Sequence, residues 1–162
     1  MKKNISKISI ILILLIVLAG CGGDKNTDKV FTYENMEITL PKNFKEHEME
    51  RYNKVYSTDK VAIYVIKESK NEYKKLKEIN LNEYFELVKT ANSKENAESK
   101  KLDNIPIFTY TISPKEDEKY SYYVSCHESE DAFWTIEFST LEEDYKEMEE
   151  SFDKWCKSIT FK

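Results

Sequence analysis

The chain has 162 residues, with 25 basic and 30 acidic side chains and a formal net charge of −5. This length falls in the range of a single domain. An acidic surface repels phosphate backbones and anionic lipid head groups, and Arg51 is the one arginine that could clamp a phosphate with two hydrogen bonds. The composition therefore excludes a nucleic-acid-binding protein.

The N-terminus has the features of an export signal. Lys2, Lys3 and Lys7 precede an apolar run over residues 8–19. That run is shorter than the roughly 20 residues that a membrane-spanning helix needs, and has the length of a signal-peptide core. It ends in Leu18-Ala19-Gly20-Cys21, which resembles the lipobox of bacterial lipoproteins. We expect a signal peptide over 1–20 and a lipidated Cys21; the alternative is a plain secretory signal followed by a chance cysteine.

The predicted anchor has consequences for place and charge. Two or more acyl chains hold a protein stably on a membrane, so we expect the chain on the outer face of the cell membrane. Residues 21–29 are predicted to form a flexible tether, and residues 30–162 a single globular domain. Without the leader's three lysines, 22 basic residues face 30 acidic ones, a net charge near −8.

All three glycines, Gly20, Gly22 and Gly23, lie in the leader or the tether. Phosphate-binding loops, dinucleotide fingerprints and nucleophile elbows need glycine where the backbone turns tightly or approaches a ligand. The domain therefore contains none of them in recognisable form. Left-handed turn positions must instead use residues such as asparagine and aspartate.

The first half of the domain is predicted to contain two hairpins and a helix. The hairpins pair residues 30–33 with 36–40, and 51–57 with 61–68. A helix capped by Asn80 or Asn82 follows, because apolar side chains recur there at helical spacing. The charged segment 93–101 is either mobile or an edge strand protected by lysines.

Three further strands are expected over 106–113, 119–128 and 132–140. A three-residue loop would pair Glu128 with Ala132, with Asp131 in the left-handed position. This register places Cys126 opposite Trp134 and gathers the apolar side chains of both strands on one face.

The C-terminal helix is predicted from a capping box of Thr140 and Glu143, an acidic first turn and an apolar stripe. The stripe consists of Tyr145, Met148, Phe152, Trp155, Cys156 and Ile159. Hairpins and a meander, rather than alternating strands and helices, indicate an α+β fold with an antiparallel sheet flanked by helices.

This order of elements resembles the PsbP-like family, which includes photosystem extrinsic subunits and many bacterial lipoproteins. The similarity lies in Met36 to Pro41 followed by Phe44, in Phe133 to Phe138, and in the C-terminal segments from Phe152 to Trp155 and from Ser158 to Phe161. The resemblance implies a binding or assembly subunit rather than an enzyme. It transfers no functional residue, since the matching positions are core positions.

Once Cys21 is lipidated, Cys126 and Cys156 remain. The predicted register turns Cys126 toward the C-terminal helix, on whose apolar stripe Cys156 lies. A disulfide would contribute roughly 3–4 kcal/mol by closing a loop of about 30 residues. We favour this disulfide over the alternative of two separate buried thiols.

The sequence gives little support for catalysis. His47 is expected in a solvated loop, and His127 on the face of its strand opposite Cys126. No spacing of ligands predicts a metal site, and no cofactor is expected. The alternative to a non-catalytic module is an envelope hydrolase or thiol enzyme using His127 or Cys126.

One positive indication of function is a group of tyrosines. Tyr110, Tyr120, Tyr122 and Tyr123 lie on adjoining predicted strands, where uncovered tyrosines would mark a partner surface. We therefore expect a membrane-anchored binding or accessory module whose partner is a protein or an envelope polymer.

The anchor can be tested by mass spectrometry of the exported protein. We expect residues 1–20 to be absent and the sulfur of Cys21 to carry a lipid. A bare sulfur, or a leader still attached, would contradict the assignment of place.

Overall fold

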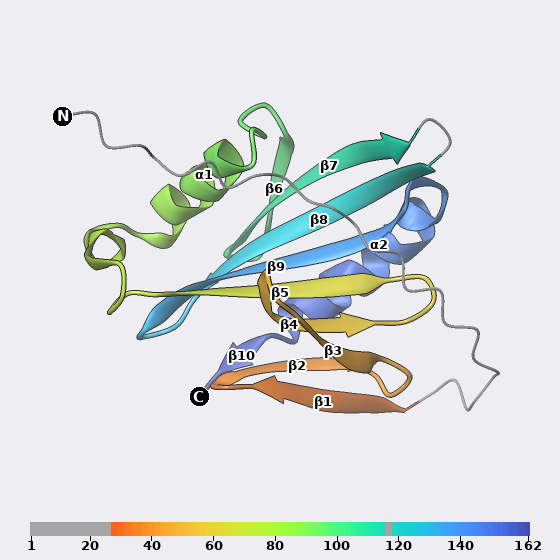
Figure 1. The fold of residues 1–162 in the computed structure, drawn as a ribbon, viewed down its shortest axis with the longest axis horizontal. Helices are drawn as coiled ribbons and strands as arrows, with labels where there is room; N and C mark the ends of the chain where they lie inside the picture. Colours follow the sequence, from red (N-terminus) through yellow and green to blue (C-terminus); the bar gives the residue numbers. More distant parts are fainter. Residues whose placement is uncertain (1–26, 116–117) are drawn as a thin grey trace.

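The computed structural model describes residues 27–115 and 118–162. The signal peptide, Cys21 and most of the tether lie outside the described residues. Two antiparallel sheets and two α-helices confirm the predicted α+β class, with the C-terminal helix packed on the larger sheet (Figure 1). Within the described residues, no helix combines the length and apolar character needed to cross a bilayer.

The smaller sheet contains the first predicted hairpin and the end of the chain. Its order is β1 (Asp28–Tyr33), β2 (Met36–Pro41) and β10 (Thr160–Phe161). Tyr33 pairs with Met36, and Glu34 in the turn between them adopts a φ of 51°. The left-handed position is thus filled by a residue other than glycine, at one of the turns that the sequence predicted.

The larger sheet has seven strands in the order β3-β4-β5-β9-β8-β7-β6. All of its neighbouring strands pair antiparallel. The charged segment after the first helix forms β6, the edge-strand alternative. The strands are β3 (Lys45–Met49), β4 (Tyr52–Ser57), β5 (Ala62–Ser69), β6 (Glu98–Leu102), β7 (Ile105–Lys115), β8 (Glu118–Glu128) and β9 (Ala132–Leu141).

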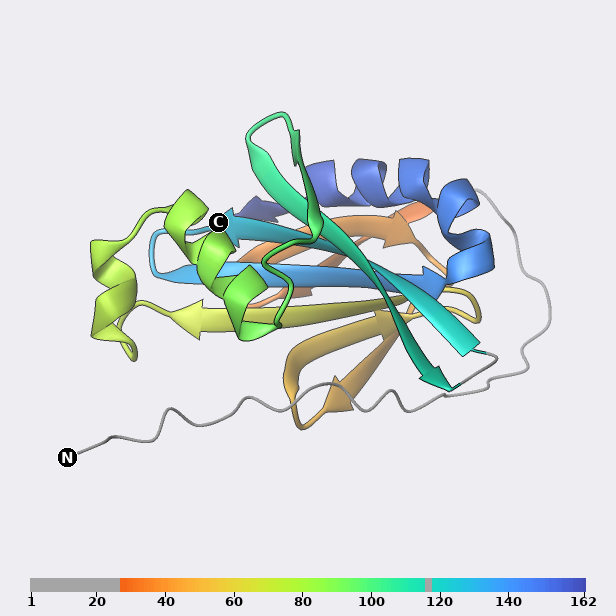
Figure 2. The ribbon, with the colours of Figure 1, turned by 90° about the horizontal axis from the view of Figure 1, so that it is seen from above.

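One face of the larger sheet, the α2 face, packs against α2 (Glu142–Lys157) and the smaller sheet (Figure 2). Phe138 of β9 contacts both Phe152 and Trp155 of α2. The predicted capping box is wrong, because Thr140 Oγ1 donates a hydrogen bond to the carbonyl of Lys60 at 3.0 Å. The N-cap is Leu141, whose apolar side chain cannot accept a hydrogen bond from the backbone of the first turn.

The opposite face, the α1 face, packs against α1 (Leu81–Ala91), which follows the short 3-10 helix η1 (Lys74–Glu78). Asn80 is the N-cap and forms a capping box with Glu83. Tyr84 stacks on Phe133 with ring centroids 4.5 Å apart. Helix α1 therefore covers one end of the sheet, as Figure 2 shows from above.

The predicted register of β8 and β9 is wrong by one residue. Glu128 pairs with Phe133 instead of Ala132, because the turn closes through a hydrogen bond from the Ser129 N–H to the Ala132 carbonyl. Asp131 is not left-handed. One residue of slip moves a side chain to the other face, so Cys126 lies opposite Thr135 on the α1 face.

The predicted disulfide is wrong for the same reason. Cys126 packs with α1, whereas Cys156 of α2 packs on the other side of the sheet. Both thiols are free and fully buried. The two cysteines are therefore separate buried thiols that pack as small apolar side chains, the alternative considered above.

The free thiols can be counted. After unfolding without a reductant, we expect a maleimide to label both Cys126 and Cys156, and we expect the same mass shift when reductant is added first. Labelling that depends on prior reduction would contradict the structure. The Cys126→Ala and Cys156→Ala variants, each expected to lose one label, are the matched controls.

Candidate functional site

Among the described residues, helix α1 covers one end of the α1 face and no helix lies over the rest. Tyrosines from four strands lie on this part, and we call the set the tyrosine platform. The Tyr52 and Tyr64 rings lie 4.6 Å apart, and the Tyr110 and Tyr122 rings stack at 4.9 Å. The platform consists of Tyr52, Tyr64, Tyr110, Tyr120 and Tyr122, of which Tyr122 is buried and the others half-buried.

The strand pairing explains this placement. Tyr110 pairs with Tyr122, and Tyr122 pairs with Ser139 on the next strand. Side chains directly opposite in an antiparallel sheet share a face, so the two tyrosines stand side by side. The hydroxyl of Tyr110 is buried and has no hydrogen-bond partner among the described residues.

Glu137 of β9 lies among these tyrosines. It pairs with Tyr64 on one side and with Val124 on the other. The residue is 4 % exposed, and no hydrogen bond joins its carboxylate to another described residue. Burial alone raises the pKa of Glu137 to about 7, because the charged form loses its hydration without gaining a partner.

The platform contains three of the four predicted surface tyrosines. Tyr110, Tyr120 and Tyr122 share the α1 face, but Tyr123 points to the α2 face and is fully buried. Its ring contacts Phe152, and its hydroxyl donates to Asp153 at 2.7 Å. Adjacent residues of a strand face opposite sides, so Tyr122 and Tyr123 could not both belong to one surface.

Sequence reasoning missed Glu137, Tyr52 and Tyr64. A signal existed in β9, where Thr135, Glu137 and Ser139 alternate with apolar residues. On a strand covered on both sides, such alternation marks one face that is polar yet buried. Tyr52 is the first residue of β4, so the strand pattern does not indicate which face its side chain occupies. Its ring contact with Tyr64 places it in the platform.

His127 and Cys156 meet on the α2 face. His127 Nε2 lies 3.0 Å from Ser125 Oγ and 3.9 Å from Cys156 Sγ. Burial lowers the pKa of His127 to about 4, and burial raises the pKa of the Cys156 thiol to about 11. Near pH 7 the pair is therefore a neutral imidazole and a protonated thiol, whereas a thiol nucleophile must be a thiolate.

The other predicted candidates lie apart from this pair. Cys126 is fully buried on the α1 face, where burial raises the pKa of its thiol. His47 lies in β3 rather than in a loop, with Nε2 2.9 Å from Ser57 Oγ. Across residues 27–115 and 118–162, no group of three His, Cys, Asp or Glu side chains could hold a metal ion.

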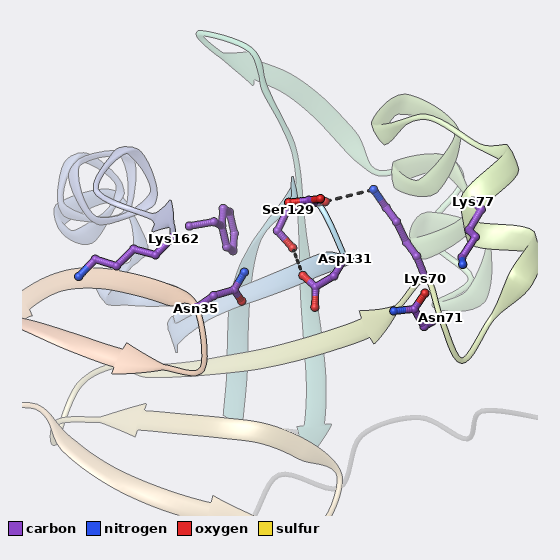
Figure 3. Close-up of a pocket in the computed structure, with 9 residues that line it drawn as sticks. Asn35, Lys70, Asn71, Lys77, Ser129, Asp131 and Lys162 are labelled. Atoms are coloured by element: carbon purple, nitrogen blue, oxygen red, sulfur yellow. Dashed lines mark hydrogen bonds between the residues drawn. The ribbon is translucent and has the colours of Figure 1, made fainter.

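A polar cleft of about 800 Å³ lies at the end of the sheet beside the β8–β9 turn (Figure 3). Lys70 donates to the Ser129 carbonyl at 3.1 Å and pairs with Glu128 at 2.7 Å. Lys162 pairs with Glu37. The cleft is lined by Asn35, Lys70, Asn71, Lys77, Ser129, Glu130, Asp131, Phe161 and Lys162.

The charges around this cleft largely compensate one another. Asp131 lies 2.8 Å from Lys67, and this contact together with the Ser129 hydroxyl lowers the pKa of Asp131. Lysine ammonium groups that already have carboxylate partners have less to gain from an added anion. The cleft is therefore a weaker candidate than the platform, where Glu137 has no compensating charge from any residue that the structure describes.

Comparison with known proteins identifies the fold. The structure is similar to the solution structure of cyanobacterial PsbP (CyanoP) from Synechocystis sp. PCC 6803, with a TM-score of 0.55 and 14 % identity over 90 % of this chain and 99 % of that chain. A crystal structure from Bacteroides thetaiotaomicron VPI-5482 gives a TM-score of 0.51 and 10 % identity, over 79 % of this chain and 45 % of the other. No family model and no curated protein matches the sequence. The fold is PsbP-like, as the resemblance in sequence implied.

The two buried titratable groups predict opposite pH effects on stability. The pKa of His127 is about 4 when folded and about 6.5 when unfolded, so its contribution to the free energy of unfolding rises with pH across that window. The pKa of Glu137 is about 7 when folded and near 4.5 when unfolded, so its contribution falls as pH rises from about 4.5 to 7. Each contribution is roughly 3 kcal/mol.

Chemical denaturation between pH 4.5 and 6.5 measures the contributions of His127 and Glu137 to the free energy of unfolding. Relative to the parent chain, we expect the free energy of unfolding of His127→Gln to fall more steeply with rising pH. That of Glu137→Gln should rise more steeply. The half-buried His47 provides the control, His47→Gln, which should follow the parent; parallel curves for all four chains would contradict the burial of these groups.

Proposed function

We propose that this PsbP-like domain is a lipid-anchored, non-catalytic binding or accessory module on the outer face of the cell membrane. The observation that carries the proposal is the tyrosine platform, a part of a buried sheet face that no helix covers. Aromatic side chains left in this way favour contact with a partner. The partner is a protein or an envelope polymer.

The anchor supports a location close to the membrane. Strand β1 begins at Asp28, seven residues after Cys21. Seven residues of fully extended chain span at most about 25 Å. A domain tied at Cys21 would therefore meet partners in or beside the bilayer.

The state of the thiols and of His127 supports a non-catalytic role. His127 is 6 % exposed and both thiols are fully buried, so a substrate would have to open the core to reach them. The protonation states expected near pH 7 give neither a thiolate nor an ion pair. The alternative, a thiol enzyme or hydrolase using His127 or Cys126, requires a reactive group that this arrangement disfavours.

Cross-linking on intact cells tests the binding role. A photoreactive amino acid in place of Tyr120, at the edge of the platform, is expected to give discrete cross-linked species. The same group in place of the exposed Lys146 on α2 is the matched control and should give fewer. A second change, Tyr64→Ala, should remove the species formed from position 120.

Two outcomes would overturn the proposal. The first is equal cross-linking from positions 120 and 146, or none from position 120. The second is rapid alkylation of Cys126 or Cys156 in the native protein near neutral pH, which would restore the thiol enzyme. In a Cys21→Ser chain, loss of the cross-links together with release from the membrane would tie the contacts to the anchor.

A further inference from the structure

We propose that Glu137 and the tyrosine platform form a binding site for an organic ammonium group. The ligand class is a primary or substituted amine, whether a free amine or the end of a lysine side chain. This inference rests on the proposed binding role of the platform and specifies its chemistry. Three observations on the α1 face carry it.

The first observation is a carboxylate that the fold leaves without a partner. Glu137 is 4 % exposed and has no hydrogen bond or ion pair within the described part of the chain. By contrast, the hydroxyl of the buried Tyr84 on the same face donates a hydrogen bond to Glu68 and lies 2.9 Å from Thr135 Oγ1. Burying a charged group without a partner is costly, and a cation that reaches Glu137 would recover that cost.

The second observation is the arrangement of aromatic rings around this acid. On β5, Tyr64 is directly opposite Glu137. On β8, Val124 is opposite Glu137, and Tyr122 lies two positions from Val124 along the strand. Ring faces attract ammonium groups within about 6 Å of the ring centroid. Carboxylate and rings together favour an organic cation over a hydrated metal ion, because rings replace water poorly for small hard cations.

The third observation is that the platform already attracts an ammonium group of this chain. Lys94, in the loop after α1, places Nζ 4.7 Å from the centroid of the Tyr110 ring. Lys94 belongs to the rim, whereas Glu137 lies beneath the rings. The rim contact shows that these ring faces accept an alkylammonium group in this setting.

The charge state of the site follows from its surroundings. Burial raises the pKa of every platform tyrosine, so all of them are neutral near pH 7. The Cys126 thiol, also on this face, is neutral for the same reason. Glu137 is then the group whose charge changes near neutral pH, while Lys94 stays positive. An ammonium ligand should therefore bind more tightly as pH rises from 6 to 8.

The test uses the mature chain and defined probes. Chemical shifts of the tyrosine rings are followed while n-butylammonium, or N-acetyl-lysine N-methylamide, is titrated at pH 8. The neutral isostere 1-butanol is the matched probe. We expect both ammonium probes to shift platform resonances with an affinity at least about tenfold above that of 1-butanol.

Two variants assign the effect to Glu137. Glu137→Gln keeps the shape but removes the charge, and should lower ammonium affinity about tenfold and abolish its pH dependence. The exposed Glu147 on α2 provides the control, because Glu147→Gln changes the net charge equally and should leave affinity unchanged. Glu137→Gln should fold, since it removes a buried charge, and its thermal unfolding at pH 8 checks this.

The outcomes separate this inference from the proposed function. Equal binding of 1-butanol, or an unchanged affinity in Glu137→Gln, would overturn the ammonium site while leaving an aromatic binding surface. No ring shifts with any probe would also overturn it, and cross-linking from position 120 would then decide the binding role by itself. Preference for N-acetyl-lysine N-methylamide over n-butylammonium would indicate a lysine side chain as the natural source.

Discussion

Strand β9 is buried from Ala132 to Thr140, between β5 and β8 in the middle of the larger sheet. Since both of its faces are covered for much of its length, its register with β8 decides which side chains enter which core. The pairing of Glu128 with Phe133 sends Trp134, Ile136 and Phe138 toward α2. It sends Thr135, Glu137 and Ser139 toward the opposite face, where the platform lies.

This arrangement gives the two faces different characters. The α2 face is closed by a helix and a second sheet, and within it Trp134 Nε1 donates a hydrogen bond to Ser129 Oγ at 3.0 Å. The α1 face is closed by a helix at one end only, and Glu137 lies among its tyrosines without a charged partner in the described part of the chain. Buried ionisable groups with shifted pKa values concentrate at functional sites. In the part of the α1 face that α1 leaves uncovered, the burial of Glu137 therefore lowers the stability of the fold.

Much of the fold could be predicted from the sequence because local signals agreed. The start of α1 at Asn80, one of the two caps considered, the apolar stripe of α2 and the hairpin around Glu34 each depend on residues close together in the chain. The β8–β9 register could not be predicted, since a three-residue and a four-residue connection differ by one backbone hydrogen bond at Ser129. That single error also produced the false disulfide. The carboxylate of Glu137 was missed because its burial depends on tyrosines from β4, β5, β7 and β8.

The edges of the larger sheet limit how a partner can engage it. Edge strand β3 has the sequence Lys-Glu-His-Glu-Met, and edge strand β6 has Glu-Ser-Lys-Lys-Leu. Charged side chains, lysines above all, oppose pairing with a strand from another chain. Recognition by β-augmentation, in which a peptide extends a sheet along its rim, is thereby disfavoured. A partner is therefore expected to contact a face of the larger sheet rather than one of its edges, and copies of the chain at high local concentration would not join into a continuous sheet.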